Sequence, residues 1–264
     1  MNIENGEVKY KHIGGPKITI KYSANWPEIS LLDFFENEDV IFRFMDTSYL
    51  AGNYYIKVPQ NEHIFDKDKI DVWDWMEINI KKESQYDTAT KSIRVDSIQY
   101  NVIQNLKSTK KYSLIFDDDG KGEAADIITI YENDNKIYIE FYHCKYSAEI
   151  KPGARVGDLY EVCGQSNKSV DWKKDISKLI MHMKSRESLR YKKGERSRFE
   201  IGSQKTLAIL EKKLKHYRAQ LNVIVVQPGV SRIKISDSQL EVLGSTEHYL
   251  LSTYQIGFRV ITSE

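Results

Sequence analysis

The stretch Asp117–Ser147, which reads D-D-D-G-K-G-E-A-A-D-I-I-T-I-Y-E-N-D-N-K-I-Y-I-E-F-Y-H-C-K-Y-S, decides the fold of this chain. Two runs rich in β-branched and aromatic residues flank the turn residues E-N-D-N at 132–135, a pattern that predicts a β-hairpin. The first strand is expected to begin at Asp126 and the second to end at 143–145. An acid on one strand and a lysine at the end of its neighbour suit metal-dependent phosphodiester chemistry.

The chain on either side of this hairpin alternates between helical and strand patterns. Helical periodicity predicts helices that begin near residues 96, 156, 170, 203 and 236. The nearly all-apolar run Leu221–Val226 is typical of a strand buried on both faces, and a short strand at 111–116 and a last one at 256–261 complete the pattern. The sequence therefore predicts an α/β domain over 91–264, with a mixed central sheet flanked by helices in the order αβββ-ααα-βαβ.

Residues 1–90 are expected to form a β-rich accessory domain. Four runs of strand-forming residues, at 8–13, 17–22, 39–44 and 53–58, are separated by turn residues. Trp73 and Trp75 follow and could form either a base-stacking platform or part of a core. The polar stretch 81–91 is the expected linker to the second domain.

Composition indicates a globular protein of a reducing compartment. The chain has 264 residues, of which 41% are hydrophobic, and no apolar run is long enough to cross a bilayer. The polar, mixed-charge start of the sequence does not resemble a secretory signal. Two cysteines in a chain of this length are typical of intracellular proteins. We therefore expect a cytoplasmic protein without a membrane partner.

The net charge of +1 conceals an uneven distribution. Between residues 168 and 198, eleven lysines and arginines face four acids, a net charge of +7. Such a segment is either a solvated helix face or the contact surface for a polyanion. On the second interpretation it contacts a nucleic-acid backbone, with candidates Arg155, Lys173, Lys174, Arg186 and Arg190. Arg155 is included because it lies near the start of the helix expected at 156, where backbone donors favour anions.

Phosphodiester hydrolysis needs carboxylates that hold a hard cation and a group that offsets negative charge. Asp126 and Lys145 suit these two roles, and His143 shares a strand face with Lys145. Glu161 and Gln165, four residues apart on a helix, share one face and could join them. Glu123, three residues before Asp126, could bind the same metal. The expected metal ligands are thus Asp126, Glu123 and Glu161, around Mg²⁺ or Mn²⁺.

The order of these elements resembles the PD-(D/E)XK, or restriction-endonuclease-like, superfamily over residues 96–264. Four stretches further resemble the nuclease module at the C-terminus of some bacterial helicase-like proteins of phage-defence loci: G-E-A-A-D, F-Y-H-C-K-Y-S, P-G-A-R-V-G-D-L-Y-E-V-C-G-Q and V-V-Q-P-G-V-S. The resemblance implies a metal-dependent DNA endonuclease of little sequence specificity, with Asp126 as metal-binding acid and Lys145 as catalytic lysine. It also implies a role in defence against foreign DNA and a helicase or ATPase partner; a homo-oligomer is possible.

One position departs from the pattern of that superfamily. Where its members carry E-x-K or Q-x-K, this chain has H-C-K, with His143 in place of the second acid. Either Glu123 or Glu161 supplies the missing carboxylate while His143 carries protons or contacts phosphate, or His143 binds the metal and Mn²⁺ is preferred. We favour the first interpretation.

Other interpretations of the same residues lead to different functions. An EF-hand calcium loop is excluded, because neither Gly120 nor Gly122 at its sixth position puts acids at both ends of the loop. A zinc site of His143, Cys144, Cys163 and His182 lacks the usual spacing. Gln99, on the helix that precedes the hairpin, either positions the site or is an ordinary exposed side chain. The main alternative to a nuclease is a catalytically decayed module that binds nucleic acid or serves as a helicase adaptor.

Overall fold

The computed structural model describes residues 2–4, 7–21, 23–25, 27–38, 40–45, 48–52, 54–57, 64–87 and 89–264. The chain divides into two compact units, Met1–Glu62 and His63–Glu264. The larger unit holds all of the candidate site residues.

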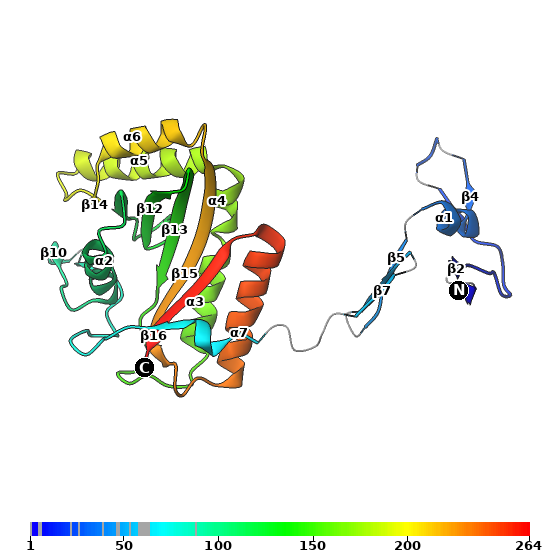
Figure 1. The fold of residues 1–264 in the computed structure, drawn as a ribbon, viewed down its shortest axis with the longest axis horizontal. Coiled ribbons are helices and arrows are strands. Elements are labelled where there is room, and N and C mark those ends of the chain that lie inside the picture. Colours follow the sequence, from blue (N-terminus) through cyan, green and yellow to red (C-terminus); the bar gives the residue numbers. More distant parts are fainter. Residues whose placement is uncertain are drawn as a thin grey trace. The chain divides into compact units, whose positions relative to one another are not determined.

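A seven-stranded mixed sheet forms the centre of the larger unit (Figure 1). Its strands, in spatial order, are β14 (Phe199–Ile201), β11 (Leu114–Asp117), β12 (Ile127–Asn133), β13 (Lys136–Cys144), β15 (Arg218–Ser231), β16 (Gly257–Ser263) and β8 (Ile70–Val72). The pairs from β14 to β13 are antiparallel, and those from β13 to β8 are parallel. The predicted α/β class with a mixed sheet flanked by helices is therefore confirmed.

Helices cover both faces of this sheet (Figure 1). One face packs against five helices: α3 (Gly157–Asn167), α4 (Val170–Lys174), α5 (Ile176–Lys192), α6 (Gln204–Lys213) and α7 (Asp237–His248). The other face packs against α2 (Ile98–Ser108) and the segment around Trp75 and Ile80. Strand β15 contributes Val223 and Val225 to the first core and Ile224 and Val226 to the second, so it is buried on both faces as its composition predicted.

The hairpin of β12 and β13 forms where the sequence predicted it. Ile127 pairs with Tyr142 and Asn133 with Lys136, and Asp134 and Asn135 make the turn with φ angles of 47° and 58°. Two residues with positive φ give a turn whose twist matches that of the flanking strands, and Asn and Asp tolerate this conformation better than other residues with a side chain. The register places Asp126 beside the end of β13.

Several boundaries differ from those predicted. The helix expected from residue 170 to 191 is two helices, because Asp175 leaves the helical conformation (φ −151°, ψ 88°) and its side chain caps Lys178. Strand β14 was not predicted. The stretch 81–91, expected to be a linker, is packed against the larger unit: Gln85 is buried there, and β9 (Tyr86–Asp87) pairs with β10 (Ser92–Ile93). Residue 88 lies outside the described residues.

In its described residues, the smaller unit consists of short strands and the helix α1 (Leu31–Asn37). The strands are β1 (Asn2–Glu4), β2 (Glu7–Lys9), β3 (Thr19–Ile20), β4 (Ile29–Ser30), β5 (Ile41–Arg43), β6 (Tyr49–Ala51) and β7 (Tyr54–Ile56). Helix α1, which was not predicted, begins at the capping residue Ser30. Of the runs expected to form strands, residues 22, 39, 53 and 58 lie outside the described residues.

Two shorter helical segments, η1 (Lys67–Lys69) and η2 (Tyr249–Thr253), complete the larger unit. Among the residues that the structure describes, no helix combines the length and the apolar character needed to cross a membrane.

Candidate active site

Asp126 and Lys145 meet at the end of the hairpin. Asp126 immediately precedes β12 and Lys145 immediately follows β13, and the antiparallel register brings these two points together. The backbone N–H of Cys144 donates to Oδ2 of Asp126 at 2.8 Å. Asp126 is only 4% exposed. The hairpin thus fixes the buried carboxylate of Asp126 against the backbone of Cys144, the residue before Lys145.

Two more carboxylates join Asp126. Oxygen atoms of Asp119, Glu123 and Asp126 all lie within 4.8 Å of one another, and we call these three residues the acid cluster. Asp119 and Glu123 come from the loop between β11 and β12, which turns at Gly120 and Gly122 with φ angles of 113° and 84°. The backbone N–H of Gly120 donates to Glu123 at 2.6 Å and so closes the turn.

The acid cluster is electrostatically strained without a cation. Burial raises the pKa of Asp126 well above its usual value, and the nearby negative charges of Glu123 and Asp119 raise it further. Burial likewise raises the pKa of Glu123. Three carboxylate oxygens this close together form a set that a divalent cation such as Mg²⁺ would stabilise. The acid cluster therefore fits a divalent metal.

Lys145 lies between two glutamates. Its Nζ is 2.6 Å from Oε1 of Glu161 on α3 and 3.5 Å from Oε2 of Glu83. Burial alone would lower the pKa of Lys145, but the hydrogen bond that Lys145 donates to Glu161 and the charge of Glu83 outweigh it, so the pKa lies above its usual value. Although Lys145 is only 6% exposed, it is paired with acids and not enclosed by apolar side chains. It carries a positive charge at neutral pH.

Glu83 belongs to the site and was missed by the sequence analysis. Its carboxylate accepts from the backbone N–H of Tyr146 at 2.9 Å, in addition to its contact with Lys145. Burial raises its pKa despite these two favourable contacts. Glu83 lies in the stretch that was expected to be a linker, and nothing in the local pattern marks it as a site residue. Its role depends on a tertiary contact.

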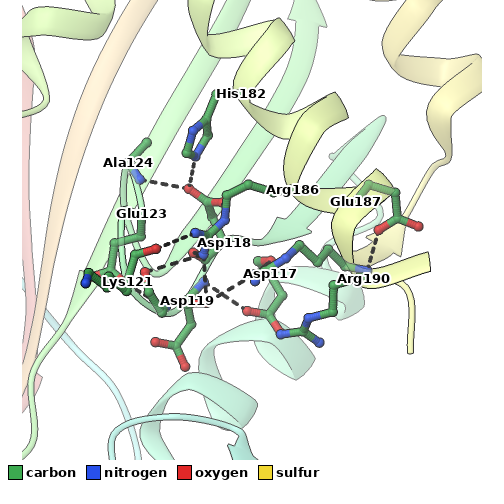
Figure 2. A network of polar contacts seen from close by, with 12 residues as sticks. Asp117, Asp118, Asp119, Lys121, Glu123, Ala124, His182, Arg186, Glu187 and Arg190 are labelled. Carbon is green, nitrogen blue, oxygen red and sulfur yellow. Dashed lines mark hydrogen bonds and ion pairs between the residues drawn. The ribbon is translucent and has the colours of Figure 1, made fainter. Parts of the chain in front are cut away.

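The loop that carries Asp119 and Glu123 is held from α5 (Figure 2). The buried carboxylate of Asp118 lies 2.7 Å from Nε2 of His182 and 2.6 Å from Nε of Arg186, and accepts from the backbone N–H of Ala124 at 2.8 Å. The guanidinium of Arg186 also donates to backbone carbonyls of the loop, among them Asp119 at 2.9 Å and Lys121 at 2.8 Å. We call residues 117–124 the acid loop.

A pair of glutamine side chains holds the base of the acid loop on the side of α2. Gln85 and Gln99 each donate to the carboxylate of Asp117 at 3.0 Å. Gln99 also donates to the backbone carbonyl of Asp126 at 3.3 Å. Gln99 is buried, so the interpretation of an ordinary exposed side chain is wrong, and a positioning role stays a prediction that these contacts support.

His143 does not face the acid cluster. Its Nε2 lies 2.8 Å from Oγ of Ser169, on the sheet face that α3 and α4 cover. Burial, together with the charge of Lys168, lowers the pKa of His143 to about 3, so the ring is neutral. The expectation that His143 carries protons or binds metal is corrected for this reason. The zinc set fails as well, because Cys144 and Cys163 belong to the cores on opposite faces of the sheet.

The two expected residues of α3 have different surroundings. Glu161, whose side chain is 53% exposed, pairs with Lys145 and is not part of the acid cluster, so its assignment as a metal ligand is corrected. Gln165 is half-buried one turn further along α3. No hydrogen bond joins Gln165 to the acid cluster within the part of the chain that the structure describes.

The basic residues expected to contact nucleic acid have partners within the chain. Arg155 donates to Ser147 and Glu149, Lys173 to the backbone carbonyl of Tyr254, and Lys174 to Asp171. Arg186 holds the acid loop, and Arg190 lies 3.5 Å from Glu195. They are therefore not a row of free cations, and their contact with nucleic acid stays a prediction. Arg190 and Arg186 nevertheless line a pocket, which is described below.

Comparison with known proteins identifies no relative. The chain matches no protein-family model, no curated protein and no solved structure.

Proposed function

We propose that this protein is a divalent-cation-dependent nuclease that hydrolyses phosphodiester bonds of DNA. The observation that carries the proposal is that the acid cluster and the buried, positively charged Lys145 lie at the end of the same hairpin, with Glu83 close to both. Metal-binding carboxylates next to a fixed cation are the groups that phosphodiester hydrolysis requires. The order of helix and strands around them supports the restriction-endonuclease-like fold that the sequence suggested.

Each residue has a role that follows from its position. Asp119, Glu123 and Asp126 would hold the cation, which when bound polarises the phosphoryl oxygens and offsets their charge. Lys145 is placed to stabilise negative charge that develops on the phosphate and to orient the attacking water. Glu83 and Glu161 keep Lys145 in place, and the raised pKa of Glu83 makes it a better proton acceptor than an ordinary glutamate.

The choice of metal follows from the position of His143. With His143 directed at Ser169, the candidate ligands are all carboxylate oxygens. Oxygen donors suit Mg²⁺ and Mn²⁺, whereas imidazole would have favoured later transition metals. We therefore infer that Mg²⁺ is sufficient, and that Asp119, not Glu161 or His143, supplies the third ligand beside Asp126 and Glu123.

Plasmid nicking with and without EDTA tests this proposal. We expect Asp126→Asn and Lys145→Met each to lower the Mg²⁺-dependent nicking rate by about 100-fold or more. Asp171→Asn and Lys205→Met, which change exposed residues away from the site, serve as controls for charge and should leave the rate unchanged. An Asp126→Asn protein that nicks as fast as the wild type in Mg²⁺ would contradict the proposal.

A second candidate function is favoured by the H-C-K sequence itself. Residue 143 is a histidine where the superfamily carries an acid, and its ring is buried against Ser169. Neither an acid nor this ring is therefore available to a metal at that position, as expected of a catalytically decayed module. Such a module would bind DNA equally well in EDTA and would not cut it in any divalent metal. The proposed role in defence against foreign DNA, and a helicase or ATPase partner, rest on the resemblance of four sequence stretches.

A further inference from the structure

A pocket of 250 Å³ lies beside the acid loop, on the side of α5. Its charged lining consists of Lys121, Arg186, Arg190, Lys193, Arg198 and Glu195, five positive charges against one negative. Gly120 and Lys121 line this pocket, while Asp119 and Glu123 of the same loop belong to the acid cluster. The acid loop thus has a metal-binding side and a basic side.

The three arginines of the pocket are fixed in place by the fold, whereas Lys121 and Lys193 are exposed at its edge. Arg190 and Arg198 are 9% and 8% exposed, and Arg198 donates to the backbone carbonyl of Asp117 at 2.7 Å. The ring of Tyr86 lies 5.2 Å from the guanidinium carbon of Arg190. Arg186 and Arg190 both extend from α5 toward the acid loop, as Figure 2 shows. Side chains held in this way lose little conformational entropy when they bind a ligand.

The positive charge is only partly compensated. Asp118 pairs with Arg186 and Glu195 with Arg190, whereas the guanidinium of Arg198 forms hydrogen bonds only with carbonyl groups in the described part of the chain, and the nearby charges of Asp117 and Asp118 offset its own charge in part. The buried Nε of Arg198 has no acceptor in the described part of the chain. Burial, and then the charges of Arg186 and Arg190, lower the pKa of Arg198. An anion in the pocket would relieve this repulsion.

Size and chemistry limit what this anion can be. The pocket is smaller than the roughly 300–1,000 Å³ of sites for drug-sized ligands. Guanidinium groups bind phosphate oxygens in paired hydrogen bonds. We propose that this pocket binds a phosphate group of the nucleic-acid strand, adjacent to the phosphodiester that is cut. The assignment of that phosphate to a strand rests on the proposed nuclease function, whereas binding of phosphate as such does not.

Binding measured in EDTA separates the pocket from catalysis. The full chain is titrated with a fluorescent DNA oligonucleotide at several salt concentrations, and separately with inorganic phosphate while its melting temperature is followed. We expect Lys121→Glu/Lys193→Glu to weaken DNA binding about tenfold or more, and to reduce the slope of log K against log salt by about 1 for each phosphate contact that is lost. Inorganic phosphate should stabilise the wild type but not this variant.

A matched control excludes a general effect of charge. Lys192→Glu/Lys205→Glu makes the same change in net charge at exposed positions outside the pocket, and should bind DNA within about twofold of the wild type. Equal weakening by both double variants would overturn the proposal. The Lys121→Glu/Lys193→Glu variant could lose stabilisation by inorganic phosphate and still bind DNA like the wild type. That result would assign the pocket to free phosphate and overturn its assignment to the nucleic-acid strand. A wild-type protein that binds DNA in EDTA as expected but does not nick it in Mg²⁺ would refute only the nuclease function.

Discussion

The charge state of Asp126 depends on its surroundings more than on its intrinsic chemistry. Its pKa is raised in the folded protein, so the folded state disfavours the ionised form relative to the unfolded chain. Asp126 contributes stability at pH values below its pKa in the unfolded chain, which is near 4. That contribution is lost as the pH rises through its pKa in the folded protein. In EDTA, Asp126 thus makes the protein less stable as the pH rises above about 4.

We expect Asp126→Asn to remove this destabilisation. In EDTA at pH 8 the variant should melt at a higher temperature than the wild type, by about 2–4 °C for each kcal/mol recovered. Mg²⁺ should raise the melting temperature of the wild type more at pH 8 than at pH 5, and should leave the variant nearly unchanged. Calorimetry at both pH values measures these differences. Equal melting temperatures in EDTA at pH 8 would contradict the account of the acid cluster.

His143 acts on stability in the opposite direction. Its pKa falls from 6.5 to about 3 on folding, so its contribution is complete above pH 6.5 and is lost as the pH falls toward 3. The loss amounts to at most about 5 kcal/mol. We expect His143→Gln, which can still bond Ser169 but does not titrate, to shift acid unfolding to lower pH while Mg²⁺-dependent nicking stays within a few-fold of the wild type. Acid titration followed by circular dichroism tests the shift, and a hundredfold loss of nicking would return His143 to the active site.

At the level of single residues, the sequence predicted what depends on strand register. Asp126 and Lys145 lie where the hairpin pattern placed them, although their roles stay predictions. The contact of His143 was not predictable: Lys145 pairs with Glu161 of α3, as the shared strand face allowed, but the His143 ring lies against Ser169 and not against the acid cluster. Glu83 and Asp119 were missed because only the folded chain brings them to the hairpin.

Among the elements, α5 supports the acid loop through contacts with Asp118 and the loop backbone. Arg186 and His182 bond Asp118 and the loop backbone, so they position Asp119 and Glu123 without belonging to the acid cluster. We expect His182→Gln/Arg186→Gln to raise the Mg²⁺ concentration for half-maximal nicking about tenfold, because a looser loop must be ordered when the metal binds. The rate at saturating Mg²⁺ should fall much less.

The control for this prediction lies on the same helix. Lys184→Gln removes an ion pair with Glu211 on α6 and does not touch the acid loop, so its Mg²⁺ dependence should match that of the wild type. Circular dichroism checks that both proteins are folded. An unchanged Mg²⁺ dependence in the His182 and Arg186 variant would show that the loop needs no support from α5.

The sequence predicted elements well where the pattern is long and local. The hairpin and β15 follow directly from their composition, and the starts of α3 and α7 lie within two residues of those expected. The break at Asp175 and the short strand β14 were not predictable, since a cap can interrupt a helical pattern and a three-residue strand has no period to detect. The sequence showed that α5 is basic, but not that the side chains of Arg186 and Arg190 point toward the acid loop and not into solvent.

For the whole molecule, the boundary between the two units lies earlier than the sequence indicated. The chain divides between Glu62 and His63, and not near residue 90, because β8 pairs with β16 and the segment around Trp75 packs against α2. Strand β8 has three residues, and its partner lies far along the chain. No local pattern could reveal that pairing.

Shortened chains test this boundary. A chain of residues 64–264 should fold, with a melting temperature close to that of the larger unit in the full protein, and should keep Mg²⁺-dependent nicking. A chain of residues 91–264 loses β8, the apolar residues Trp75 and Ile80 and the glutamate beside Lys145, so we expect it to be destabilised by several kcal/mol and inactive. Thermal melting and nicking of both chains are the measurements. Equal stability would place the boundary at residue 90 after all.

The pairing of β8 with β16 has a consequence for the timing of activity during translation. Trp73 and Trp75 both donate to the backbone carbonyl of Thr262, so the segment that leads to Glu83 is anchored on a strand that the ribosome makes almost 200 residues later. A chain that ends before β16 lacks the strand on which this segment is anchored. On the proposed nuclease function, we expect such a chain, released or still bound to the ribosome, not to nick DNA in Mg²⁺.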